Sequence, residues 1–216
     1  MMEDPTKNER MDWSETLRKY EIPTVYKEAL LRPYFENVDL KEPILDAGCG
    51  TGYFSNILCK RGYKVTGIDL NGELQSNDRF DFMKADIIKF ETDKNFETIL
   101  LINILATAPP AERLKMLQKI KELKTESGTA YVVNTSAELF GSDFESDALS
   151  SHPVGENKVK VRAKLVDGKF IEFTDYLVTE KEIREMCKAV DLEIVEKQDF
   201  KPDELEKPVY EIYSLK

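Results

Sequence analysis

Residues 42–58 read EPILDAGCGTGYFSNIL: an apolar run, an aspartate, three glycines within five residues, and a second apolar run. The first run has the length of a buried strand and the second the spacing of a helix, so the glycines fall in the connection between them. Glycine there permits a tight turn and a close approach of the backbone to a ligand. We therefore predict a ligand-binding strand–loop–helix unit, with a merely structural tight turn as the alternative.

The composition indicates an acidic, folded protein. The chain has 216 residues, 41% of them hydrophobic, and a formal net charge of −10. This charge repels the phosphates of nucleic acids and anionic lipids, so we expect neither nucleic acid nor membrane as a partner. The three cysteines, Cys49, Cys59 and Cys187, have no metal-ligand spacing, which predicts no metal and reduced thiols. The polar first residues and the lack of a long apolar run predict a cytoplasmic protein. The sequence does not choose between a monomer and a homodimer, and we expect one of the two.

The order of apolar segments predicts an α/β fold. Strand-length apolar bursts alternate with helix-length segments, the pattern of a doubly wound, mostly parallel sheet with crossover helices. The run around Ile99 is apolar throughout, as in a central strand buried on both faces. A helix is expected to start at Pro109–Pro110, and the fifth strand to open at Gly128. Two helices are expected over Met11–Phe35, the second of them beginning at Pro23.

The segment after Ser136 departs from this alternation. Asp167–Gly168 lies between two alternating runs, which predicts a β-hairpin that pairs Val161 with Phe173 and Ala163 with Ile171. A helix with a capping box from Thr179 to Glu182 should follow. Two last strands with a short connection must then lie antiparallel. The sheet is therefore expected to have seven strands, the last of them antiparallel.

The glycine loop does not fit the two commonest phosphate-binding patterns. The dinucleotide pattern G-x-G-x-x-G requires glycine at position 53, which is Tyr53, and no Gly-Lys-Ser/Thr follows for a Walker loop. Instead, Asp46–Gly52 reads acid-x-G-x-G-x-G and resembles motif I of the class I S-adenosylmethionine-dependent methyltransferases. The resemblance covers residues 41–135 closely and the last helix and strand pair more loosely. It implies S-adenosylmethionine as cofactor and S-adenosylhomocysteine as product.

The resemblance also implies a set of cofactor contacts at the carboxyl ends of the strands. In that family the first acid anchors the glycine loop and the amino group, and the acid after the second strand, here Asp69, binds the ribose hydroxyls. Helix capping by Asp69 and a satisfied strand-end position for Asn103 are the structural alternatives. Leu70 and Ile87 are implied to pack on the adenine ring, Asp86 to bind the adenine amino group, and Asn103 to lie at the junction with the substrate. The full set of implied cofactor-binding residues is Asp46, Ala47, Gly48, Cys49, Gly50, Asp69, Leu70, Asp86, Ile87 and Asn103.

The acceptor side is defined less sharply by the sequence. In the family, the N-terminal helices and the insert before the last helix choose the acceptor. Aromatic residues there either line an acceptor site or serve as core residues, and we select Tyr20 and Tyr176 as substrate-binding. His152 is either a base or an exposed loop residue. No catalytic residue is assigned, because a sulfonium leaving group needs a general base only if the nucleophile must lose a proton.

We expect one domain of four parts. These are a helical cap at 11–36, a cofactor-binding half at 41–135, a substrate-cap insert with the hairpin at 136–178, and a closing helix and strand pair at 179–216. The implied reaction is in-line methyl transfer to oxygen, nitrogen or carbon of a small molecule. The alternatives are a non-catalytic S-adenosylmethionine-binding protein and a nicotinamide oxidoreductase. Two departures from the family pattern are the short polar segment after Asp69 and Asp191, where relatives often have glycine.

Overall fold

The computed structural model describes residues 26–71, 73–141, 143–145, 149–155, 157–164, 170–201 and 208–216. Its central sheet has seven strands in the order β10-β11-β5-β4-β1-β2-β3. Strands β1 to β5 are parallel, and β11 is antiparallel to both β5 and β10, which confirms the predicted sheet. The strands are β1 (Ile44–Ala47), β2 (Val65–Asp69), β3 (Phe80–Lys84), β4 (Phe96–Ile102), β5 (Lys124–Thr135), β10 (Ile194–Phe200) and β11 (Tyr210–Leu215).

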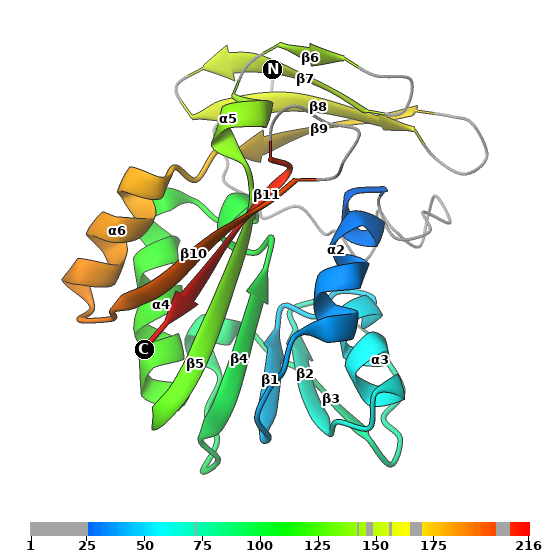
Figure 1. Cartoon of the computed structure of the whole chain (residues 1–216), viewed down its shortest axis with the longest axis vertical. Helices are drawn as coiled ribbons and strands as arrows, with labels where there is room; N and C mark the ends of the chain where they lie inside the picture. Colours follow the sequence, from blue (N-terminus) through cyan, green and yellow to red (C-terminus); the bar gives the residue numbers. More distant parts are fainter. Residues whose placement is uncertain are drawn as a thin grey trace, which may run out of the picture.

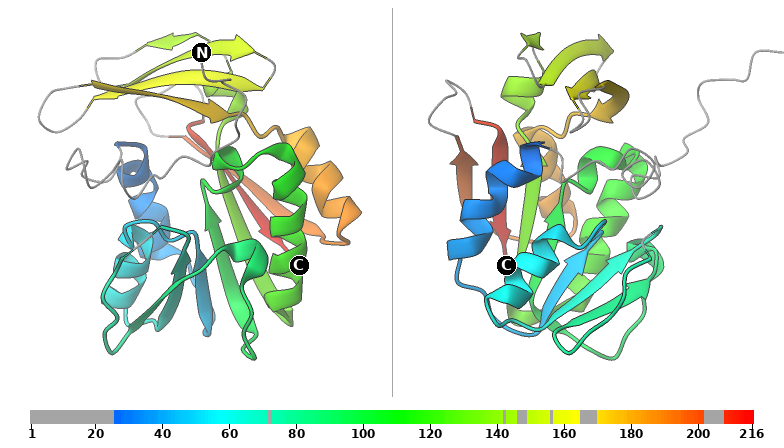
Figure 2. Two further views of the ribbon diagram at one scale, coloured as in Figure 1. Left: turned by 180° about the vertical axis from the view of Figure 1, so that it is seen from behind. Right: turned by 90° about the vertical axis from the view of Figure 1, so that its right-hand side faces the viewer.

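Helices cover both faces of this sheet (Figures 1 and 2). Helices α2 (Tyr26–Asn37) and α3 (Tyr53–Lys60) lie on one face, and α4 (Pro110–Leu123) and α6 (Glu180–Ala189) on the other. Strand β4 contributes to two cores: Ile99 packs on the α4 and α6 side and Leu100 on the α2 and α3 side, both fully buried. Each such side chain contributes about 1.5–3 kcal/mol on burial. The prediction of a central strand buried on both faces is confirmed.

Several boundaries differ from the sequence predictions. Strand β5 begins at Lys124 rather than Gly128, because Lys124 pairs with Phe96 of β4 ahead of an irregularity in the register. Helix α2 contains Pro33 and ends at Asn37, and the expected first helix lies outside the described residues. The described residues between β2 and β3 form no helix, as their polar sequence indicated. No helix in the described part of the chain is both long and apolar enough to cross a membrane.

The insert between β5 and α6 forms a second sheet, which we call the cap sheet. Its antiparallel strands, in the order β6-β7-β8-β9, lie across the carboxyl ends of the parallel strands (Figure 1). The predicted hairpin is β8–β9 with the expected register, and its turn lies outside the described residues. The sequence predicted only this hairpin, whereas the sheet also contains β6 and β7, and β7 pairs along β8. The elements are α5 (Ala137–Phe140), β6 (Phe144–Glu145), β7 (Leu149–Gly155), β8 (Lys158–Lys164) and β9 (Phe170–Tyr176).

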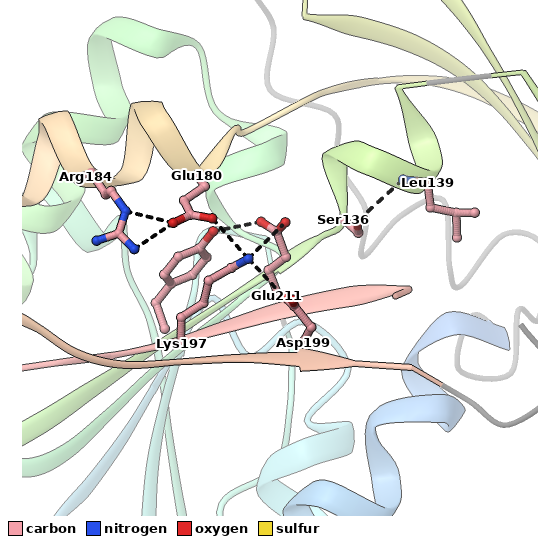
Figure 3. A network of polar contacts seen from close by, with 8 residues as sticks. Ser136, Leu139, Glu180, Arg184, Lys197, Asp199 and Glu211 are labelled. Carbon is pink, nitrogen blue, oxygen red and sulfur yellow. Dashed lines mark hydrogen bonds and ion pairs between the residues drawn. The ribbon is translucent and has the colours of Figure 1, made fainter. Parts of the chain in front are cut away.

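A polar network joins α6 to the edge of the central sheet (Figure 3). Lys197 of β10 lies 3.1 Å from Glu180 of α6 and 2.9 Å from Asp199. Glu211 of β11 is 3.7 Å from Lys197 and accepts a 2.8 Å hydrogen bond from the Tyr213 hydroxyl. Burial raises the pKa of the Glu211 carboxyl. Arg184 of α6 also pairs with Glu180, at 2.6 Å, so two cations, Lys197 and Arg184, balance three carboxylates at this edge.

We expect Lys197→Met to lower the free energy of unfolding by about 1–3 kcal/mol, the usual cost when a charged hydrogen-bond partner is removed. The loss should be larger at pH 8 than at pH 5, because protonation relieves the repulsion among the remaining carboxylates. Urea unfolding measures both quantities. Lys160→Met is the matched control, because Lys160 pairs with Glu172 on the exposed face of the cap sheet and should contribute under about 1 kcal/mol. Equal losses in the two variants would contradict the prediction.

Candidate functional site

The loop between β1 and α3 holds three glycines in the left-handed conformation. Gly48, Gly50 and Gly52 have φ values of 77°, 54° and 74°. Side chains at such angles are strained, so the backbone itself explains the glycine cluster. The amides of Gly48 and Cys49 both donate to the Ile68 carbonyl of β2, at 2.8 and 3.0 Å. These two hydrogen bonds fix the loop to the neighbouring strand β2.

Asp69, the last residue of β2, binds the same loop through its side chain. One carboxylate oxygen accepts from the Gly50 amide at 2.9 Å and the other from the Asn71 amide at 2.9 Å. No helix follows Asp69 among the described residues before β3, so the helix-cap alternative raised from the sequence finds no support there. Each carboxylate oxygen can accept more than one hydrogen bond, so these contacts are compatible with a hydroxyl-bearing ligand.

Asp46 lies beneath the loop, within β1 rather than after it. Its side chain is 2% exposed and accepts a 2.6 Å hydrogen bond from the hydroxyl of Ser55 on α3. Burial raises the pKa of the Asp46 carboxyl to about 6, the hydrogen bond from Ser55 opposes the rise, and the charge of Asp69 adds to it. The two carboxylates thus create a negative potential beside the glycine loop.

The remaining residues expected around the adenine lie nearby in the chain but differ in environment. Asp86 follows β3 and accepts from the Ile88 amide at 3.0 Å, which caps the short helix η1 (Ile87–Lys89). Leu70 is exposed, whereas Ile87 is 6% exposed and packs within the core on the α4 side. Asp86 and Leu70 are therefore placed to meet a ligand more directly than Ile87 is.

Asn103 follows β4 and also has a left-handed backbone, with φ of 58°. Its amide oxygen accepts from the Thr135 hydroxyl at 3.3 Å, and its backbone amide donates to the Val133 carbonyl. The next residue, Ile104, approaches Gly48 so closely that a Cβ at Gly48 would lie 2.5 Å from Ile104 Cγ1. The ends of β1 and β4 are therefore in direct contact at this edge.

The residues predicted for the acceptor side fall in different regions. Tyr176 ends β9 of the cap sheet and is partly buried, with the Lys158 ammonium 5.3 Å from its ring centroid. Tyr20 lies outside the described residues. His152 is on strand β7 rather than in a loop, is exposed, and lies 3.0 Å from Asp143. Tyr176 is thus the described aromatic residue that we retain for the acceptor side.

Sequence reasoning did not single out Ser55 or Arg113. Ser55 follows Asp46 by nine residues, and the two side chains meet because the glycine loop turns the chain back on itself. The sequence alone does not give the path of this turn. Arg113 is 1% exposed, and it precedes Leu117 by four residues on the buried face of α4. A charged residue in register with the apolar positions of a helix was the available signal.

Comparison with known proteins gives a match to a protein family. Residues 44–128 match the family model described as a methyltransferase domain. Over 140 residues the chain is 29% identical to (S)-tetrahydroprotoberberine N-methyltransferase of Eschscholzia californica, which covers 56% of this chain and 38% of that protein. The chain thus spans well under half the length of this curated relative.

Solved structures share the fold at low sequence identity. A S-adenosylmethionine-dependent methyltransferase from Clostridium acetobutylicum is 14% identical with a TM-score of 0.61, over 96% of this chain and 92% of that one. The glycopeptide N-methyltransferase MtfA is 13% identical with a TM-score of 0.65, over 88% and 89%. MtfA structures are also known in complex with S-adenosylhomocysteine and with S-adenosylmethionine.

Proposed function

We propose that this chain transfers a methyl group from S-adenosylmethionine to a small-molecule acceptor. Residues 44–128 match a methyltransferase domain, and the fold is that of class I S-adenosylmethionine-dependent methyltransferases. The observation that supports this most strongly is the left-handed glycine loop, which follows the buried Asp46 and is bound by Asp69 through the Gly50 amide. The cap sheet lies across the same edge, where acceptor selection is expected (Figure 1).

The residues around the loop fit such a cofactor. A Cβ built on Gly50 would meet nothing within 4 Å, so the loop backbone is open to close approach at this point. The carboxylates of Asp46 and Asp69 suit a ligand that carries an ammonium and a sulfonium charge beside ribose hydroxyls. We assign Gly48, Cys49 and Gly50 to the methionine part, Asp69 to the ribose, and Leu70 and Asp86 to the adenine.

The chemistry asks little of the protein beyond alignment. S-adenosylmethionine, when bound, supplies a methyl group that its sulfonium charge already activates. The glycine loop and the acids orient the cofactor, and the cap sheet keeps water away while the acceptor atom is in line. An acceptor whose attacking atom does not have to lose a proton then needs no base from the protein. We propose oxygen, nitrogen or carbon as the acceptor atom, and Tyr176 as one wall of the acceptor site.

Turnover distinguishes this enzyme from a protein that only binds the cofactor. We expect formation of S-adenosylhomocysteine when the protein and S-adenosylmethionine are mixed with a metabolite extract, and much less without the extract. Mass spectrometry of the product identifies the methylated compound. Binding of the cofactor without turnover across fractionated extracts would favour the binding protein.

A thermal-shift comparison addresses the nicotinamide alternative. A ligand at a hundred times its dissociation constant adds about 2.7 kcal/mol to folding stability. We expect this stabilisation from S-adenosylhomocysteine and none from NAD. The opposite pattern would support a nicotinamide oxidoreductase.

Asp69→Ala is expected to lower the affinity for S-adenosylhomocysteine about tenfold or more, because hydrogen bonds to a charged group contribute about 1.5–3 kcal/mol. The variant loses the proposed ribose acceptor and the acceptor of the Gly50 amide at 2.9 Å. Calorimetric titration measures the affinity, and urea unfolding without ligand separates any weakening of the loop. Asp81→Ala, which removes an exposed carboxylate from the next strand, is the matched control. Equal affinities for the two variants would refute the ribose assignment.

A further inference from the structure

The guanidinium of Arg113 is buried at the start of α4 and bound on several sides. Its Nε donates to the backbone carbonyls of Leu105 and Ala108, at 2.9 and 3.0 Å. One terminal nitrogen lies 2.6 Å from the carboxylate of Glu182 on α6. Burying a charge is costly unless it is paired and hydrogen-bonded, so these contacts hold Arg113 in one place.

Glu182 was expected to close the capping box of α6, but in the structure its carboxylate pairs with Arg113. The Thr179 hydroxyl does accept from the Glu182 amide at 3.2 Å, which confirms the first half of the box. The Glu182 carboxylate, however, accepts from Arg113. The first turn of α6 is thereby tied to α4 instead of being capped only from within.

Arg113 also reaches the cap sheet. Its guanidinium carbon lies 5.5 Å from the ring centroid of Tyr176, within the range of a cation–π interaction. Tyr176 is the last residue of β9 and lies in the expected acceptor side. Among the residues that the structure describes, the other terminal nitrogen of Arg113 has no hydrogen-bond partner. The Tyr176 ring is therefore the contact that remains for the cation.

The segment that Arg113 holds leads directly to the glycine loop. The short helix η2 (Leu105–Thr107) follows Ile104, and Thr107 bonds back to the Ile104 carbonyl through its amide at 3.1 Å and its hydroxyl at 2.9 Å. Ile104 in turn fills the space beside Gly48. A continuous set of contacts thus runs from Tyr176 through Arg113 and η2 to the proposed cofactor loop.

We infer that Arg113 is a positioning residue that fixes the acceptor side and the cofactor loop in one geometry; the inference rests on the proposed methyl transfer. In-line displacement requires both reactants to be aligned, and a misplacement of 1 Å can cost about a hundredfold in rate. Arg113 meets this requirement without touching the reactants, because its three groups of contacts belong to η2, α6 and β9. Lysine cannot replace it, because an ammonium lacks the planar fork that serves these directions together.

The test uses the full chain and S-adenosylhomocysteine as the probe. We expect Arg113→Lys to lower the affinity about tenfold in calorimetry, since Ile104 is no longer held against the loop. Tyr176→Leu, which removes the ring at a partly buried site, should lower it about threefold, and Tyr176→Phe should lose less because the ring is kept. Arg184→Met is the control, because Arg184 is an exposed arginine on α6 that pairs with Glu180.

A double-mutant cycle separates positioning from general stability. If the contact transmits the effect of the cap, Tyr176→Leu should change the affinity little further in the Arg113→Lys background. Additive losses, or an Arg113→Lys affinity within twofold of wild type, would overturn the inference while leaving the proposed function intact. No binding of S-adenosylhomocysteine by the wild-type chain would overturn the proposed function, and this inference with it. If Arg113→Lys fails to fold, equal affinities of Tyr176→Leu and wild type overturn the inference.

Discussion

Gly48→Ala is expected to reduce the affinity for S-adenosylhomocysteine by about a hundredfold or more. The substitution places a side chain at φ of 77°, in the left-handed region, and its Cβ would lie 2.5 Å from Ile104 Cγ1. Ile104 must then move out of its position or the loop must move away from β4. Either change displaces the proposed cofactor contacts, and overpacking with strain should also cost about 1–3 kcal/mol of folding stability. Calorimetric titration and urea unfolding measure the two effects.

Two further variants separate the causes. Gly62 has φ of 102° and nothing within 4 Å of a built Cβ, so Gly62→Ala carries backbone strain without a clash. It should cost about 1 kcal/mol of stability and leave the ligand affinity unchanged. Adding Ile104→Ala to Gly48→Ala removes the clash and should recover part of the stability. An affinity of Gly48→Ala within threefold of wild type would contradict the proposed site.

Asp46→Asn is expected to act in opposite directions on stability and on ligand binding. Burial raises the pKa of Asp46 from 3.8 to about 6, and this difference corresponds to about 3 kcal/mol. Asparagine removes the buried charge and still accepts from Ser55, so the ligand-free variant should unfold with a higher free energy at pH 8. The same change should weaken binding of the cationic cofactor about tenfold or more, because the buried negative charge behind the proposed cofactor loop is gone.

The pH dependence has a definite sign. Because the pKa of Asp46 is raised in the folded state, its contribution to stability is fully present below about pH 4. That contribution is lost as the pH rises through about 6, so wild type should lose stability relative to Asp46→Asn over this window. Cofactor affinity should rise over the same window in wild type, since a cation favours the ionised carboxyl. Asp81→Asn, an exposed carboxylate, is the control, and parallel pH profiles for wild type and Asp46→Asn would disprove this account.

The sequence predicted correctly those features that are set by residues close together in the chain. Three glycines directly behind Asp46 predicted a tight, ligand-binding loop, and the left-handed angles at Gly48 and Gly50 give the physical reason for them. The alternation about Asp167–Gly168 predicted the register of Val161 with Phe173 because this register puts the apolar residues on one face. Such features depend on residues close in the chain.

Other features depend on partners far along the chain. Strand β7 contains His152, Pro153 and Gly155 and has little apolar alternation, so its pairing with β8 could not be read from its own residues. Arg113 and Glu182 are 69 residues apart, and each has an ordinary local explanation. Lys124 enters β5 only because β4 offers Phe96 as a partner. In each case the neighbouring element supplies the information.

The cap sheet is one uninterrupted insertion, which leaves the central sheet after β5 and returns at α6. The backbone at its start is secured independently of the insertion, because the Ser136 amide donates to the Val209 carbonyl at 2.9 Å. We therefore expect that the segment proposed to select the acceptor can be replaced as one piece, while the strands and loop proposed to hold the cofactor are kept. Replacing these roughly forty residues would then change the proposed acceptor site without requiring a new site for the methyl donor.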